Sequence, residues 1–104
     1  MTGKSTIEID PELSDLIPGF LARKRTDLQT ILESVRNGDF ESIGRIAHRL
    51  KGEGGSFGIE AITEAGRDIE GAARAREPDA IISFARELLT YLDSVHIVYA
   101  PPAR

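Results

Sequence analysis

Apolar residues recur every three or four positions along nearly the whole chain, and this spacing constrains the fold more than any other feature. A period near 3.6 residues places such side chains on one face of an α-helix. No stretch shows the sustained strict alternation of a half-buried strand. The pattern therefore predicts an all-α protein.

Capping and turn residues divide this pattern into one short and four longer helices. Asp10-Pro11 and Asp39 are typical helix starts, and Pro18-Gly19 separates the short first helix from the second. Connections of two to four residues favour antiparallel neighbours, so we expect an up-down-up-down four-helix bundle with a short additional N-terminal helix. The predicted helices cover about residues 10–18, 20–36, 39–57, 59–73 and 78–95.

The length and composition limit the chain to one core. Its 104 residues, 40% of them hydrophobic, can fill the interior of one compact domain without disulfides. We therefore expect one domain spanning residues 1–104, ordered over about 10–97 with loosely ordered tails. We also expect a monomer, and Met1 together with the final PPAR favours a small free-standing protein.

Charge and residue content argue against several functions. The formal net charge is −4 and Lys and Arg form no block, which argues against nucleic-acid binding. Apolar runs are far shorter than the roughly 18 residues of a membrane span, and the amino terminus lacks the apolar core of a signal peptide. We therefore expect a cytoplasmic protein that does not bind membranes. Without cysteine, and with two histidines far apart, the chain is expected to have no metal or cofactor of its own.

His48 is the residue with the most distinctive neighbours. On the predicted third helix it faces away from the apolar stripe, and Gly44, Gly52 and Gly55 lie on the same face. Each glycine costs a helix about 1 kcal/mol relative to alanine, so a bare strip around a histidine indicates a surface that a partner must approach closely. Lys51, three residues after the histidine, can place an ammonium beside an anion attached to the imidazole.

The fourth predicted helix brings a carboxylate to the level of this histidine. If the chain reverses near residues 57–59, Glu70 lies opposite His48, with Arg67 and Arg74 along the same polar edge. A carboxylate there accepts the Nδ1 proton and leaves Nε2 as the exposed nucleophile. Alone, such an edge is more often a row of solvated ion pairs, and only its level opposite the histidine singles out Glu70.

The segment AHRLKGEGGSFG, residues 47–58, resembles the signature of histidine-containing phosphotransfer (HPt) domains, the phosphoryl carriers of two-component relays. That signature is a histidine followed by Lys-Gly three and four residues later and by Gly ten residues later. His48, Lys51, Gly52 and Gly58 match it. The resemblance implies that the histidine is the phosphoacceptor, that Lys51 stabilises the phosphoryl oxygens, that Gly52 provides clearance and that Glu70 is the Nδ1 partner.

By this resemblance, neutral His48 attacks the aspartyl phosphate of a response-regulator receiver domain and later passes the phosphoryl group to another receiver. The protein is then a stoichiometric carrier without an ATP site, and the Mg²⁺ belongs to the receiver. Two alternatives stay open, namely direct phosphorylation by a histidine kinase, with a hybrid kinase as a further candidate partner, and a purely binding helical module. The expected partner-binding residues are Gly44, Arg45, Lys51, Gly52, Gly55 and Arg74.

Overall fold

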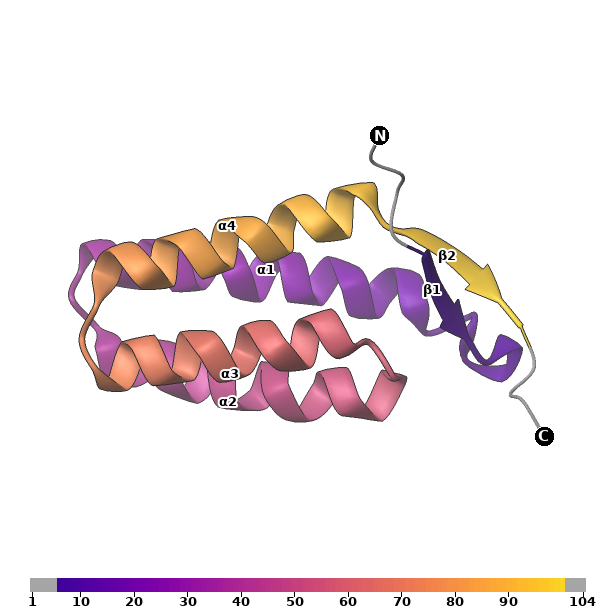
Figure 1. Ribbon diagram of the computed structural model, residues 1–104, viewed down its shortest axis with the longest axis horizontal. Coiled ribbons are helices and arrows are strands. Elements are labelled where there is room, and N and C mark those ends of the chain that lie inside the picture. Colours follow the sequence, from indigo (N-terminus) through magenta and orange to yellow (C-terminus); the bar gives the residue numbers. More distant parts are fainter. Residues whose placement is uncertain (1–5, 101–104) are drawn as a thin grey trace.

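Four long helices packed side by side make up most of the molecule, with a small sheet at one end of the bundle (Figure 1). The computed structural model describes residues 6–100. Short turns reverse the chain between successive helices, and the predicted up-down-up-down four-helix bundle is confirmed. Its helices are α1 (Ile17–Arg36), α2 (Phe40–Phe57), α3 (Glu60–Arg74) and α4 (Pro78–Ser94).

The ends of α2 follow from its local sequence. The Asp39 carboxylate caps the helix by accepting a hydrogen bond from the Ser42 amide at 3.2 Å. Gly58 ends the helix in the left-handed conformation (φ 71°), which glycine adopts without the penalty that a Cβ brings. The chain therefore turns back toward α3 within the range that the sequence predicts.

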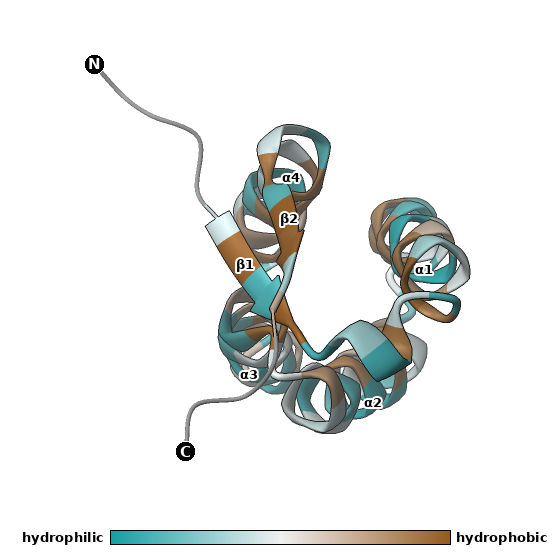
Figure 2. Ribbon diagram, turned by 90° about the vertical axis from the view of Figure 1, so that its right-hand side faces the viewer, coloured by the Kyte–Doolittle hydropathy of each residue, from teal (hydrophilic) through white to brown (hydrophobic). Residues whose placement is uncertain are grey.

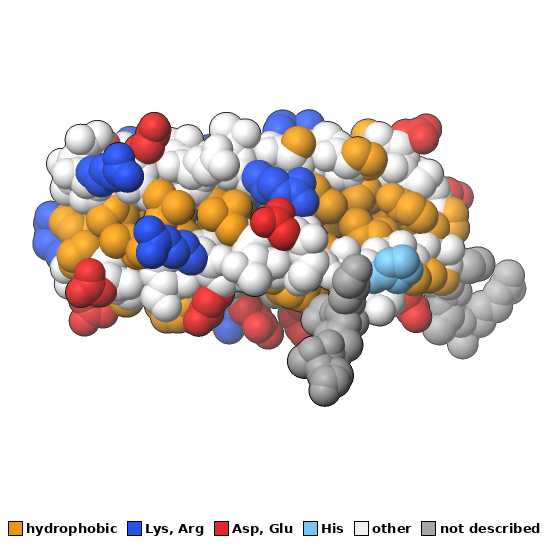
Figure 3. All heavy atoms as spheres, turned by 90° about the horizontal axis from the view of Figure 1, so that it is seen from above, with side chains coloured by type: hydrophobic (Ala, Val, Ile, Leu, Met, Phe, Trp, Pro, Cys, Tyr) orange, Lys and Arg blue, Asp and Glu red, His pale blue; other side chains and the backbone are white. Residues whose placement is uncertain are grey.

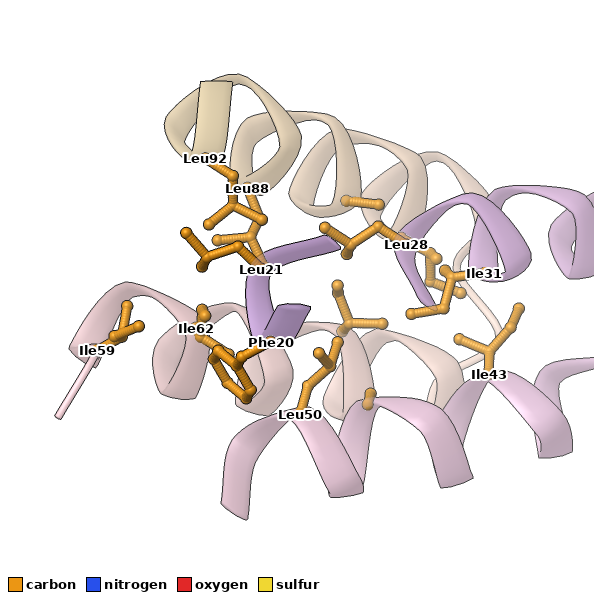
Figure 4. Packing of buried hydrophobic residues seen from close by; sticks show 14 of the residues in the cluster. Phe20, Leu21, Leu28, Ile31, Ile43, Leu50, Ile59, Ile62, Leu88 and Leu92 are labelled. Atoms are coloured by element: carbon orange, nitrogen blue, oxygen red, sulfur yellow. The ribbon is translucent and has the colours of Figure 1, made fainter. Parts of the chain in front are cut away.

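The interior is filled by aliphatic side chains from all four helices. Figure 2 views the bundle end-on, with the hydrophobic positions of the ribbon in brown. Leu28 of α1, Leu50 of α2 and Ile62 of α3 are fully buried, and Figure 4 shows them pointing into the space between the helices. Phe20 and Phe57 pack against each other with ring centroids 4.2 Å apart. This core fixes the rotation of α2 and α3, and so it fixes which of their side chains face outward.

The face along α4 is mixed in character. Seen from above, hydrophobic side chains run lengthwise between Lys, Arg, Asp and Glu side chains (Figure 3). Arg25 of α1 pairs with Asp93 of α4 (Nε–Oδ1 3.3 Å) and donates a hydrogen bond to the Leu92 carbonyl at 3.1 Å. These contacts join the first and last helices. No helix within residues 6–100 is both long and apolar enough to cross a membrane.

The amino-terminal helices differ from the prediction. The short first helix is only a three-residue 3-10 helix, Pro11–Leu13, which Asp10 caps by accepting from the Glu12 amide at 3.0 Å. The predicted break at Pro18-Gly19 is wrong, because α1 begins at Ile17 and includes both residues. Proline in the first helical turn lacks only an amide that has no partner in the helix, so it begins α1 instead of ending a helix.

Two short strands correct the expectation of loosely ordered tails. β1 (Thr6–Ile9) and β2 (His96–Tyr99) form a parallel pair in which Ile7 lies opposite Ile97. Ile7 and Ile9 are buried while Thr6 and Glu8 are exposed. This alternation lasts only four residues, which is too short to stand out in a sequence dominated by helical spacing. The remaining parts of the predicted tails, residues 1–5 and 101–104, lie outside the described residues.

Candidate functional site

His48 projects into solvent from the middle of α2. Its side chain is 69% exposed, because the helix turns Ala47 and Leu50 toward the core. The bundle therefore presents the imidazole on a rigid helix and not on a loop. Exposure of this degree leaves room for a second molecule to reach the ring.

Glu70 lies directly beside the ring, as the hairpin register of α2 and α3 predicts. The Nδ1 atom of His48 is 2.9 Å from Oε2 of Glu70, and the Lys51 ammonium donates to Oε1 of the same carboxylate at 2.9 Å. The Glu70 side chain is only 17% exposed, so the carboxylate is held between α2 and α3. One carboxylate therefore fixes both the histidine and the lysine.

This geometry sets the charge and the tautomer of the site. The hydrogen bond from Lys51 holds the pKa of the Glu70 carboxyl below its ordinary value, and the bond from His48 acts in the same direction. Partial burial of the carboxyl opposes both effects. An ionised carboxylate can only accept, so Nδ1 carries the proton of a neutral ring and Nε2 holds the lone pair. Within residues 6–100, Nε2 has no hydrogen-bond partner.

The arginines of α3 stand farther out than Glu70. Arg74 is 78% exposed, and its Nη2 atom is 4.0 Å from Oε2 of Glu70, which is a loose ion pair. Arg67 is exposed. A flexible guanidinium at the edge of the site adds positive charge near the imidazole without fixing its position.

The predicted bare strip is present in the structure. A Cβ placed on Gly44, Gly52 or Gly55 would meet no atom of the described residues within 4 Å, so open space lies over all three positions. Arg45, also on the outer surface of α2, is held by Glu41, whose Oε1 atom accepts from it at 3.3 Å. Few side chains therefore project from the helix surface around His48, and this surface is accessible to a partner.

A shallow groove adjoins Glu70 at the amino-terminal end of α2. It has a volume of about 290 Å³ and contains Gly44 of the strip. The Arg76 guanidinium lies over the Phe40 ring, 5.5 Å from its centroid, and Arg76 takes the left-handed backbone conformation (φ 56°). No feature of the sequence around His48 predicts a role for this arginine. The groove residues are Phe40, Glu41, Gly44, Glu70, Ala73, Arg74 and Arg76.

Gly66 is a second site residue that helical periodicity and the His48 motif do not predict. A Cβ there would lie 2.6 Å from the Lys51 amide nitrogen and 2.8 Å from the Ala47 carbonyl oxygen. The absence of a side chain lets α3 approach α2 closely, and this approach brings Glu70 within reach of His48. A glycine inside a helix pattern is unfavourable by about 1 kcal/mol, and that cost was the available signal.

The described residues show no metal site. Within residues 6–100, no three His, Cys, Asp or Glu side chains are grouped so that they could hold a metal ion. His96, the second histidine, is exposed at the start of β2 and stands apart from the cluster around Glu70.

Comparison with known proteins supports one family. A family model described as "Hpt domain" matches residues 15–96. The matched range begins just before α1 and ends at the first residue of β2, so it includes all four helices and every residue of the candidate site. No curated protein and no solved structure matches the chain.

Proposed function

This chain belongs to the family of HPt domains, and we propose that it carries a phosphoryl group on His48 from one receiver domain to another. HPt domains transfer phosphoryl groups in phosphorelays, interact with receiver domains, and neither use ATP nor carry a cofactor. The observation that supports His48 as the phosphoacceptor is its exposed ring, held by Glu70 at Nδ1, with no partner for Nε2 among residues 6–100.

The transfer follows from this arrangement. The Nε2 lone pair attacks the phosphorus of the receiver's aspartyl phosphate, and the bond from phosphorus to the aspartate oxygen breaks as the nitrogen–phosphorus bond forms. The ring keeps its Nδ1 proton and gains positive charge, which the Glu70 carboxylate offsets. The Lys51 ammonium, fixed beside the ring, offsets charge on the phosphoryl oxygens. Attack by the aspartate of a second receiver reverses each change.

A receiver domain that approaches His48 requires a helix surface from which few side chains project. We propose that the receiver covers Gly44, Gly52 and Gly55, where the absence of side chains leaves open space. Arg45, Lys51 and Arg74 lie around this area and supply positive charge toward an acidic pocket. The receiver brings the Mg²⁺ that its own carboxylates bind.

The state of the protein follows from the same proposal. We propose that residues 1–104 act as a single domain and as a monomer, because one exposed histidine with one carboxylate and one lysine completes the site within a single copy. The cytoplasm is the proposed location, since the phosphoryl groups of such relays derive from ATP.

Labelled phosphate tests the assignment of His48. Purified protein is mixed with a panel of phosphorylated receivers, and transfer of acid-labile, base-stable label to this chain is measured. We expect His48→Gln to keep its helical circular dichroism and to lose all label. The matched control His96→Gln alters the other exposed histidine, and it should be labelled like the parent.

Three outcomes would contradict the proposal. Label retained in His48→Gln would remove the phosphoacceptor role of this residue. Labelling by a histidine kinase and ATP, without labelling by any receiver, would favour direct phosphorylation. An unchanged phenotype in cells that carry His48→Gln would favour a purely binding module.

A further inference from the structure

A second groove lies between α3 and α4, on a different side of α3 from Glu70. Ala61 and Ala65 lie on one face of α3, and helical geometry places Glu70 roughly on the opposite face. The two helices run side by side (Figure 1), and the groove between them has a volume of about 170 Å³. Its floor is apolar and consists of Ala61, Ala65, Phe84, Leu88 and Tyr91.

The floor is partly shielded from water, and the small side chains of α3 keep it open. Ala61 and Ala65 are half-buried, and they leave space beside the larger rings of Phe84 and Tyr91. Burial raises the pKa of the Tyr91 hydroxyl. The groove therefore offers an apolar surface that a partner's side chains can cover.

Acidic side chains border this floor. Glu64, Asp68 and Glu87 line the groove itself. An adjoining hollow of about 370 Å³ shares Ala61, Glu64 and Tyr91 with it and adds Glu8 of β1 and Glu60 of α3. Within residues 6–100, no Lys or Arg side chain lines either hollow.

Among the described residues, these carboxylates form no ion pair. The ion pairs within residues 6–100 involve other acids, namely Asp27, Glu41, Glu53, Glu70 and Asp93. The two connected hollows, which we call the acidic groove, therefore combine an apolar floor with carboxylates that form no ion pair within residues 6–100.

We propose that the acidic groove docks a basic amphipathic helix of a partner protein. Apolar side chains at helical spacing would cover the floor, while Lys or Arg residues at its edges would meet the acidic border. From Glu60 to Asp68 the α3 axis rises about 12 Å, which matches about two turns of a docked helix. Nucleic acids and anionic membranes would be repelled by the same carboxylates.

Docking there is independent of phosphotransfer. The groove residues lie on the α3–α4 side of the bundle, whereas His48 lies on α2 with its partner Glu70 on the opposite face of α3. A helix in the acidic groove therefore leaves the imidazole exposed. The proposal holds whether or not the histidine is the phosphoacceptor, so the two can fail separately.

A synthetic peptide tests the proposal on the full chain. The probe is a fluorescein-labelled helical peptide of about 15 residues with Leu on one face and Lys on the other. Its binding is measured by fluorescence anisotropy, and the contact surface is mapped by amide chemical shifts. We expect shifts centred on Ala61, Ala65, Phe84 and Tyr91, and no binding of a matched peptide with Glu in place of Lys.

Matched charge variants separate docking from general attraction to an acidic protein. The groove variant is Glu64→Gln/Asp68→Asn/Glu87→Gln. The control, Glu12→Gln/Asp15→Asn/Glu33→Gln, removes the same charge from exposed residues that line neither hollow. We expect the groove variant to weaken peptide binding about tenfold, and the control to weaken it less than about twofold.

A steric variant completes the test. Ala65→Arg places a long cationic side chain on the groove floor, and it should abolish peptide binding while the rate of His48 labelling stays that of the parent. Equal weakening by the two charge variants, chemical shifts centred on His48, or full binding to Ala65→Arg would each overturn the proposal.

Discussion

Glu70 contacts both of the residues on which the proposed phosphotransfer depends. Its two carboxylate oxygens are divided between the His48 ring and the Lys51 ammonium, each at 2.9 Å. Loss of the Glu70 side chain therefore removes a hydrogen-bond partner from both the His48 ring and the Lys51 ammonium. Loss of Lys51 removes a partner only from the Glu70 carboxylate. Removing Glu70 leaves both tautomers of the ring available and frees the ammonium to move away from it.

Acid should weaken the contribution of Glu70 to stability. Its pKa is lowered in the folded protein from an ordinary value of 4.5, with the Lys51 hydrogen bond as the largest cause. A lowered pKa contributes stability that is complete above the ordinary value and is lost as pH falls through the folded value. We expect Glu70→Gln to be less stable than the parent by on the order of 1 kcal/mol at pH 7.

The measurement is urea unfolding at several pH values. The difference between the parent and Glu70→Gln should shrink once the pH falls below 4.5, whereas Glu33→Gln, at an exposed position of α1, should differ little from the parent throughout. A gap for Glu70→Gln that is the same at pH 7 and pH 3 would contradict the ion-pair explanation.

Much of this cluster follows from sequence, because helix periodicity and one turn position fix where backbones lie. The reversal near Gly58 was enough to place Glu70 opposite His48. Periodicity does not predict the hydrogen bond from the Lys51 ammonium to Glu70. A lysine side chain has four rotatable bonds, and its conformation is decided only when α2 and α3 have packed together. Periodicity also does not predict the Arg76 contact with Phe40, because it joins the turn after α3 to the first residue of α2, far away in sequence.

At the scale of the helices, the close packing of α2 against α3 depends on two glycines. Gly54 of α2 faces the backbone of α3, and Gly66 of α3 faces the backbone of α2. A Cβ on Gly54 would lie 2.6 Å from the Thr63 amide nitrogen, and a Cβ on Gly66 would lie equally close to that of Lys51. The glycine-rich end of α2 therefore contains two kinds of glycine. Gly52 faces open space while Gly54 faces a neighbouring backbone, and composition alone cannot tell them apart.

Two alanine substitutions on α3 should have opposite effects. Gly66→Ala forces the helices apart, so we expect a loss of about 1–3 kcal/mol in the free energy of unfolding. Gly71→Ala, on the same helix, meets nothing within 4 Å and should gain about 0.5–1 kcal/mol from helix propensity. Urea unfolding measures both, and a neutral or stabilising Gly66→Ala would show that the close approach is not required.

The observed bounds of the helices and strands show which parts of the fold apolar periodicity predicts. Helices α2, α3 and α4 lie close to their predicted limits, because Asp39, Gly58 and Pro78 mark some of these limits and the apolar spacing marks the others. The predicted start of α1 is wrong, because a proline such as Pro18 can stand in the first turn of a helix or just after the end of one. The apolar spacing does not distinguish these two positions. The two strands could not be predicted, because a four-residue alternation depends on a partner at the other end of the chain.

At the scale of the whole molecule, β1 connects one end of the chain to the bundle core. Ile9 is 1% exposed, so Ile9→Ala should lower the free energy of unfolding by about 2–5 kcal/mol. Thr6→Ala, at an exposed position of the same strand, should change it by less than about 0.5 kcal/mol. Thermal or urea unfolding compares the two, and equal small effects would mean that the sheet contributes little to stability.

The parallel pairing of β1 with β2 also decides how the molecule resists mechanical force. Thr6 begins the first strand and Tyr99 ends the second, so opposite pulls on these two residues run along the strands and not across them. The ladder hydrogen bonds are then loaded together in shear. An antiparallel pair joining the same ends would open one bond at a time. The β1–β2 pair therefore acts as a clamp at one end of the bundle, and the helices bear tension only after its hydrogen bonds have broken.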